Sequence, residues 1–159
     1  MASLAVAEGV LRTERWSEQE RANVETIRSF VQLLMNEHAV DQVLAKYGNG
    51  AYRQHNRNIP DGMDGITSYM RTFTARFPEF SYEVMKVLAD GDYVTFHSHA
   101  TLKKSHRGND KKGLNIVDTW RLEDGKIVEH WDAIQALDVS MRMFALFNGG
   151  KIRNANGVF

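Results

Sequence analysis

The hydrophobic residues of this chain change their spacing once, near Pro78. Before that proline they recur every three or four positions, as in amphipathic helices. After it they alternate in short runs that end at turn signals, as in strands. Helices followed by a meander of strands predict an α+β fold, in which a curved, cone-shaped, mixed or antiparallel sheet is wrapped by three N-terminal helices. Such a cone has a mouth, and ligand pockets favour concave, mostly apolar places of this kind.

Turn and cap signals place the expected elements along the chain. Ser17 and Glu20 form a capping-box pattern before the first helix, and Asp61 or Asp64 can cap the third. The first two helices are expected at residues 18–35 and 39–47, and the third ends before Pro78. The expected strands are 80–88, 93–102, 114–122 and 126–135, with a short helix at 140–147.

The 159 residues suit one domain of ordinary size. We expect a pocket domain at residues 16–136, preceded by a flexible extension at 1–15. Residues 137–159 would then form a C-terminal segment that caps the pocket or a dimer partner.

Charge and composition exclude several functions. Lys plus Arg and Asp plus Glu each number 20, so there is no basic excess to bind nucleic acid. Cysteine is absent, which excludes disulfides, thiolate metal sites and cysteine nucleophiles. Residues 1–11 are mildly apolar but lack a basic n-region, so we expect no secretory signal, no membrane span and a cytoplasmic location. Carboxylate and imidazole groups are left to carry any chemistry.

Asp124 and Gly125 mark a hairpin whose register decides which side chains meet. A two-residue loop would place Asp118 opposite Trp131. A three-residue loop, with a bulge at Gly125, would place Asp118 opposite Asp132. We favour the second register, because carboxylates that face each other within ~5.5 Å at Cβ raise the pKa of one of them when water is excluded. That group becomes a proton acceptor near neutral pH.

In this register Trp120 faces His130, and Leu122 faces Val128. The alternative is that the two aspartates are solvated on an exposed face. The aromatic and aliphatic residues interleaved with them favour the pocket, because a solvated face rarely mixes such residues so evenly.

Two histidines, His97 and His99, share one face of the expected 93–102 strand. Imidazoles at this spacing can bind a metal, with His55, His130 or an aspartate as a third ligand. The pair alone is a weak signal, because such residues more often line a polar pocket or pair with a carboxylate.

The triplet Gln54, His55 and Asn56 lies outside any periodic pattern. It is either a surface turn or a hydrogen-bonding wall of the pocket, in which case its groups need partners. Tyr52 beside it suggests partial burial. Phe73, on the third helix, is most simply a core residue.

Several motifs together resemble a known family. They are the segments 52–56, 61–62, 90–92, 97–99, 116–118 and 124–135, the last reading Asp-Gly-Lys-Ile-Val-Glu-His-Trp-Asp-Ala-Ile-Gln. They resemble the SnoaL-like proteins of the nuclear transport factor two-like superfamily, and most closely the branch of predicted SnoaL-like aldol-condensation enzymes. The resemblance covers residues 17–136, and the Asn-rich end at 154–159 is also similar to that branch.

The resemblance implies a cone-shaped fold, a deep pocket and commonly a homodimer. The SnoaL-like polyketide cyclases close a ring by an aldol reaction without metal or cofactor. An aspartate that matches Asp132 serves there as the general acid/base. A histidine stands in those cyclases where this sequence has Asp118.

We therefore expect a cofactor-free acid/base enzyme, of aldol-cyclase (lyase), isomerase or dehydratase type, for a small hydrophobic carbonyl compound. Its expected catalytic residues are Asp132 as base, Asp118 as its partner, and His97 and His99 as oxyanion donors, a role that His55 would share. The expected substrate-binding residues are Tyr52, His55, Asn56, Phe73, Trp120 and His130. The alternatives are a binding protein without catalysis and a metal site on His97 and His99.

Overall fold

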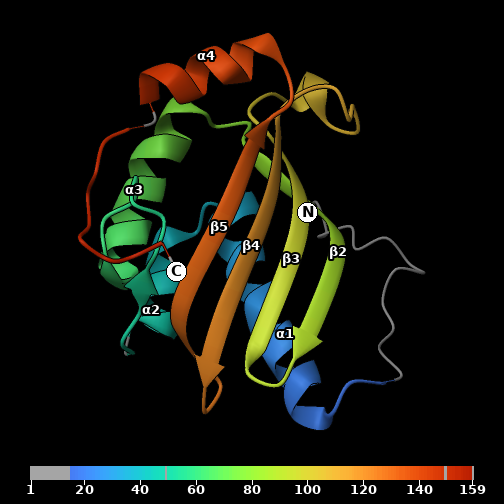
Figure 1. The fold of residues 1–159 in the computed structure, drawn as a ribbon, viewed down its shortest axis with the longest axis vertical. Coiled ribbons are helices and arrows are strands. Elements are labelled where there is room, and N and C mark those ends of the chain that lie inside the picture. Colours follow the sequence, from blue (N-terminus) through green and yellow to red (C-terminus); the bar gives the residue numbers. More distant parts are fainter. Residues whose placement is uncertain (1–14, 49, 149, 159) are drawn as a thin grey trace.

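The computed structural model describes residues 15–48, 50–148 and 150–158, and it confirms the α+β fold (Figure 1). The helical elements are α1 (Glu18–Val31), a π-helical turn η2 (Gln32–Asn36), α2 (Val40–Tyr47), α3 (Gly62–Arg76), a 3₁₀ turn η3 (Lys104–His106) and α4 (Val139–Asn148). The strands are β1 (Arg53–Gln54), β2 (Ser81–Asp90), β3 (Tyr93–Thr101), β4 (Leu114–Glu123) and β5 (Lys126–Ala136). The predicted extension at 1–15 falls, except for its last residue, outside the described residues.

The strands form one mixed sheet in the order β1-β5-β4-β3-β2. Strand β1 is parallel to β5, and the other pairs are antiparallel. In Figure 1, α1 runs behind the sheet and α4 lies across the end where β5 finishes. Among the described residues, none of the helices combines the length and the apolar character needed to cross a bilayer.

The N-terminal cap signal is confirmed in detail. The Ser17 hydroxyl accepts a hydrogen bond from the backbone N–H of Glu20, and the Glu20 carboxylate accepts one from the N–H of Ser17. The apolar stripe of α1 then packs on the inner face of the sheet. Phe30, which is 1% exposed, meets the ring of Trp120 edge-on, and Phe96 meets the same ring from β3.

The hairpin register brings Asp118 opposite Asp132, as predicted, but by a different route. The loop has two residues, and both Asp124 and Gly125 have positive φ, as a type I′ turn requires. The predicted three-residue loop is therefore wrong. The extra residue lies instead in a bulge of β5, farther from the turn. Leu122 pairs with Ile127 but Arg121 pairs with Glu129, so one residue of β5 has no partner on β4.

Candidate active site

A cavity of about 260 Å³ lies between the end of the sheet, α3 and α4. Most of its wall is apolar, and its polar groups are Asn56, Asn58, Asp118, His130 and Asp132. The aliphatic and aromatic wall residues are Met35, Ile59, Ile66, Tyr69, Met70, Phe73, Phe80, Tyr82, Leu114, Ile116, Ile134, Ala136, Phe144 and Ala145. An apolar space with a few polar groups is the usual form of a small-molecule site.

Helix α4 belongs to the predicted C-terminal segment and lines the cavity with Phe144 and Ala145. The Phe144 ring meets Phe73 edge-on, with 6.3 Å between centroids. Helix α4 thus forms part of the cavity wall, and the capping of the pocket or of a dimer partner by residues 137–159 stays a prediction.

A second hollow of about 410 Å³ lies between α1, α2 and the β4–β5 turn. Its wall includes Glu25, Lys46 and Lys126, which are all exposed. Although it is larger, it holds no buried titratable side chain, so we assign the site to the cavity beneath α4.

Asp118 and Asp132 are brought together by strand pairing, because they face each other across β4 and β5. His130 lies two residues before Asp132 and so shares its face of the sheet. One ligand atom from each of the three groups lies within 4.8 Å of the others. We call Asp118, His130 and Asp132 the acid/base cluster.

Asp118 is 2% exposed and has two hydrogen-bond partners. Its Oδ2 accepts from the Tyr82 hydroxyl at 3.2 Å, and its Oδ1 lies 3.0 Å from Nε2 of His130. Burial, followed by the charges of Asp118 and Asp132, raises the pKa of Tyr82 well above its ordinary value. Tyr82 is therefore a neutral donor to the carboxylate.

The hydrogen bonds of Gln54 determine where His130 carries a proton. Gln54 Oε1 accepts from the backbone N–H of Asn56, which identifies it as the carbonyl oxygen. The same oxygen lies 3.0 Å from Nδ1 of His130, so that nitrogen must be the donor. The 3.0 Å contact between Nε2 and Asp118 Oδ1 is then a hydrogen bond when one proton lies between them. The pair that shares this proton, as imidazolium and carboxylate or as neutral imidazole and carboxylic acid, has no net charge.

Asp132 is partly buried and is held by Asn56. Asn56 Nδ2 lies 2.8 Å and 2.7 Å from the two carboxylate oxygens, while its Oδ1 accepts from the N–H of Asn58, which confirms the amide orientation. Burial raises the pKa of Asp132, and Asp118 adds to the effect, against the opposing influence of His130 and Asn56. Asp132 is therefore a stronger base than an exposed aspartate.

Of the residues predicted for the site, five line the cavity: Asn56, Phe73, Asp118, His130 and Asp132. Trp120 and Tyr52 do not, and this placement is corrected. Trp120 is 1% exposed and stacks behind His130 with 5.2 Å between centroids. Tyr52 is also buried and stacked on the His130 ring, at 6.4 Å. Both support the imidazole from the core.

His97 and His99 lie on the opposite face of the sheet from the cluster, so their predicted place beside Asp132 is also corrected. Phe96 is the residue that pairs with Asp118, and strand alternation turns its neighbours to the other face. There His97 Nε2 contacts Asn115 Oδ1 at 2.5 Å, and His99 Nε2 contacts the carbonyl of Lys112 at 2.6 Å.

His55 also lies away from the cavity, which corrects its predicted role in binding. Its ring stacks on Trp131 at 4.5 Å between centroids, and Nε2 lies 3.3 Å from a Glu129 carboxylate oxygen. Burial favours a higher pKa for Glu129, but hydrogen bonds from Arg121 and His55 outweigh it and lower the pKa.

The predicted metal alternative on His97 and His99 finds no third ligand in the described parts of the chain, where the acid/base cluster is the one set of three close ligand groups. In that cluster His130 Nε2 is already engaged with Asp118, and a cation would have to replace this contact. We therefore describe the cluster as a hydrogen-bonded set of titratable groups.

Sequence reasoning missed Tyr82, which lies in an apolar run and donates to Asp118. It named Gln54 as a possible hydrogen-bonding residue of the pocket but did not find its partner. Gln54 orients His130 across the parallel pairing of β1 with β5, a pairing too short to leave a sequence pattern.

Comparison with known proteins places the fold among described relatives. A family model described as "SnoaL-like domain" matches residues 27–130. A structure described as "Putative polyketide cyclase", from Bacillus cereus ATCC 10987, has 17% identity and a TM-score of 0.59, and covers 83% of this chain and 91% of that one. A SnoaL-like protein of unknown function from Burkholderia thailandensis E264 has 17% identity and a TM-score of 0.56. The match covers 74% of this chain and 97% of that one.

An NTF2-like protein of unknown function from Mesorhizobium loti has 15% identity and a TM-score of 0.56, covering 77% of this chain and 98% of that one. At these identities the solved structures establish the likeness of the fold alone. No curated protein matches the chain.

Proposed function

Because the chain belongs to the SnoaL-like domain family, we propose that it is an acid/base enzyme for a small, apolar carbonyl compound. The reaction is of the aldol-cyclase, isomerase or dehydratase type. The observation that carries the proposal is the position of Asp132, a partly buried carboxylate beside a neutral aspartate–histidine pair in an apolar cavity.

Asp132 serves as the general base in this proposal. It removes a proton from the carbon next to a carbonyl, and the bonding electrons move to the carbonyl oxygen. The raised pKa of Asp132 makes it a better acceptor for such a weakly acidic proton. Asn56 holds both carboxylate oxygens, so the group is oriented before the substrate binds.

The Asp118–His130 pair serves as the acid. The proton shared by these groups passes to the developing oxyanion, which becomes an enol, and the pair is left with one negative charge. The enol carbon then attacks an electrophile, takes back a proton or expels a β-hydroxyl group. The proton on Asp132 goes to the new alkoxide, to carbon or to the leaving hydroxyl, which departs as water, and the proton on the enol oxygen returns to the pair. No electron transfer is involved, so the reaction requires no redox cofactor.

The lining of the cavity supports a neutral substrate. None of the described residues that line it is Lys or Arg, so an anionic group on the substrate would find no counter-ion there. The aromatic wall around Phe73, Phe80 and Phe144 suits an apolar body, and the acid/base cluster suits one carbonyl group.

The exchange of α-protons tests this proposal before the natural substrate is known. A panel of small neutral ketones is incubated with the protein in D₂O, and loss of the α-proton signal is followed by ¹H NMR. We expect exchange with the unaltered chain and a loss of about 10²–10⁴-fold in Asp132→Asn. The exposed Asp110→Asn is the matched control and should retain full exchange.

Two results would change the assignment. Full exchange in Asp132→Asn would remove this residue as the base. Tight binding of a ketone without exchange would favour the alternative, a small-molecule-binding protein that uses the same cavity.

We also propose that the chain is a cytoplasmic homodimer, as the family resemblance implies. The outer face of the sheet exposes apolar side chains that a second copy could cover, since Leu88, Tyr93 and Val117 are 67%, 47% and 39% exposed. Light scattering of the purified protein tests the dimer, and a monomer at micromolar concentration would exclude it.

A further inference from the structure

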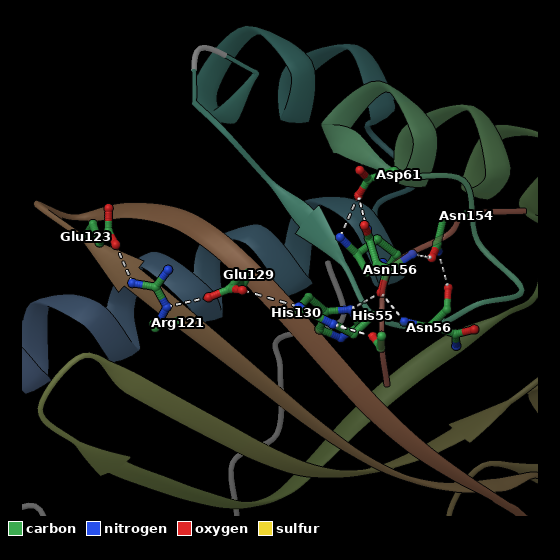
Figure 2. A network of polar contacts seen from close by, with 11 residues as sticks. His55, Asn56, Asp61, Arg121, Glu123, Glu129, His130, Asn154 and Asn156 are labelled. Carbon is green, nitrogen blue, oxygen red and sulfur yellow. Dashed lines mark hydrogen bonds and ion pairs between the residues drawn. The ribbon is translucent and has the colours of Figure 1, made fainter. Parts of the chain in front are cut away.

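The C-terminal tail, residues 150–158, returns beside the loop that follows β1 and enters the hydrogen-bond network drawn in Figure 2. The first backbone contact runs from the N–H of Arg153 to the carbonyl of Arg57, at 2.8 Å. At the other end, the carbonyl of Gly157 lies 2.6 Å from Nδ1 of His55. Between these contacts the tail presents two asparagines to the loop.

Asn154 is 9% exposed and binds the loop twice. Its Nδ2 donates to the carbonyls of Asn56, at 2.9 Å, and Ile59, at 2.7 Å. Its Oδ1 accepts from the N–H of Asn156, so the orientation of the amide is determined by its partners. Asn154 therefore fixes the backbone of the residue that holds Asp132.

Asn156 makes a similar contact at Gln54, the last residue of β1. Its Nδ2 donates to the carbonyl of Gln54 and to Oδ1 of Asp61, both at 2.8 Å. The same Asp61 oxygen accepts from the N–H of Gln54. Asp61 stands at the N-cap of α3 but makes no cap hydrogen bond with its side chain, so its carboxylate serves this junction instead.

The other side of the same loop faces the acid/base cluster. Asn56 donates to Asp132, and Gln54 accepts from His130. Each asparagine of the tail thus holds the backbone of a residue whose side chain holds a member of the cluster. Strand β1, with two residues, gives the loop little support of its own.

We propose that Asn154 and Asn156 are positioning residues of the acid/base site, which act through Asn56 and Gln54 on Asp132 and His130. Their role in positioning catalytic groups rests on the proposed function. The effect of the tail on Asp132 and His130 can be measured without turnover. Loss of the tail contacts should loosen Asn56 and weaken its hydrogen bonds to the Asp132 carboxylate.

The test follows the titration of Asp132 itself, by ¹³C NMR of the side-chain carboxyl in the full-length protein. The titratable groups that face Asp132 are Asp118, His130, Tyr52, Tyr69 and Tyr82. Assignment by Asp132→Asn separates its signal from that of Asp118.

In Asn154→Ala we expect the pKa of Asp132 to rise by about one pH unit, because hydrogen bonds to the ionised form lower it. The exposed Lys151→Ala, in the same tail, is the matched control and should leave the pKa unchanged. In an Asn56→Ala background the change at Asn154 should have no further effect, because the connecting residue is gone.

Two outcomes would overturn the proposal. One is an unchanged Asp132 pKa in a folded Asn154→Ala protein. The other is an equal rise in the presence and absence of the Asn56 side chain, which would indicate general loosening. If Asn154→Ala does not fold, Asn156→Ala provides the second test, and it should shift the ring ¹⁵N signals of His130. If the Asp132 pKa responds to Asn154→Ala as expected but no ketone exchanges its α-protons, only the proposed function is contradicted.

Discussion

Removal of the Asp118 carboxylate tests the buried pair at the centre of the site. Asp118 and His130 are 2% and 4% exposed, and Tyr82 is 7% exposed. In Asp118→Ala, the Tyr82 hydroxyl and the His130 Nε2 lose a partner in a place that water reaches poorly. Both groups would then be buried with a hydrogen bond unmade.

The size of the effect follows from these two losses. Each buried polar group left without a partner costs about 1–3 kcal/mol, and removal of one partner from a buried ion pair costs about 3–5 kcal/mol. Because these figures describe overlapping losses, we expect Asp118→Ala to lower the free energy of unfolding by about 3–5 kcal/mol.

Asp118→Asn provides the matched comparison, because the amide has the same shape. Its oxygen can accept from Tyr82, and its NH₂ group can donate to neutral Nε2 of His130, whose Nδ1 still donates to Gln54. Both buried groups keep a partner, so we expect a cost of about 1 kcal/mol, the usual net value of one hydrogen bond.

Urea unfolding at pH 7 measures both variants against the unaltered protein, with equal m-values as the check that the unfolded state is unchanged. Equal costs for Asp118→Ala and Asp118→Asn would refute the reasoning, because the amide would then replace the carboxylate no better than a methyl group does. If both costs were also small, neither Tyr82 nor His130 would depend on the carboxylate.

Three further predictions concern stability. Because the folded pKa of Asp132 lies above the unfolded value of 3.8, the unaltered chain loses stability as the pH rises through that pKa. Asp132→Asn should therefore raise the Tm at pH 7, and the gain should vanish below pH 3.8. A Cβ at Gly65 would lie 2.3 Å from the carbonyl oxygen of Pro60, so Gly65→Ala should cost about 1–3 kcal/mol in urea unfolding. Gly50→Ala, where the space is open, should be nearly neutral. Hydrogen bonds from the Ser140 hydroxyl and from the backbone N–H groups of Gly113, Met141 and Ser140 lower the pKa of Asp138 to about 2. The stability that the Asp138 carboxylate contributes should then be complete above pH 4 and disappear towards pH 2. In a pH series, the Tm of Asp138→Ala should therefore approach the Tm of the unaltered protein near pH 2.

The facing aspartates could be predicted because strand alternation and hairpin chemistry are local. Asp124 and Gly125 are strong turn residues, and a shift of one position anywhere in the hairpin brings Asp118 opposite Asp132. The place of that shift could not be predicted. A bulge near Ile127 and a three-residue loop give the same pairing at Asp118, and only the pairs nearest the turn differ.

The histidines could not be placed from sequence, because their side of the sheet depends on pairing between strands separated by a long loop. His97 and Phe96 are neighbours, and either could face the cavity until the partner of Asp118 is known. The tail contacts were also beyond sequence reasoning. Asn154 and Asn56 are 98 residues apart, and their contact joins a side chain to a backbone carbonyl, which leaves no periodic pattern.

The imidazole of the site lies on the strand next to Asp118. The resemblance to the SnoaL-like cyclases implies a histidine at the position of Asp118 itself. Here His130, on the neighbouring strand, brings its Nε2 within 3.0 Å of Asp118. The cavity therefore retains an imidazole beside Asp132. When Asp118 and His130 share one proton, the pair has no net charge, and the only net charge of the acid/base cluster is on Asp132 whenever that carboxylate is ionised. In the function proposed above, the extra carboxylate thus adds a proton-holding group without adding net charge, which is the arrangement a base and an acid need to work side by side.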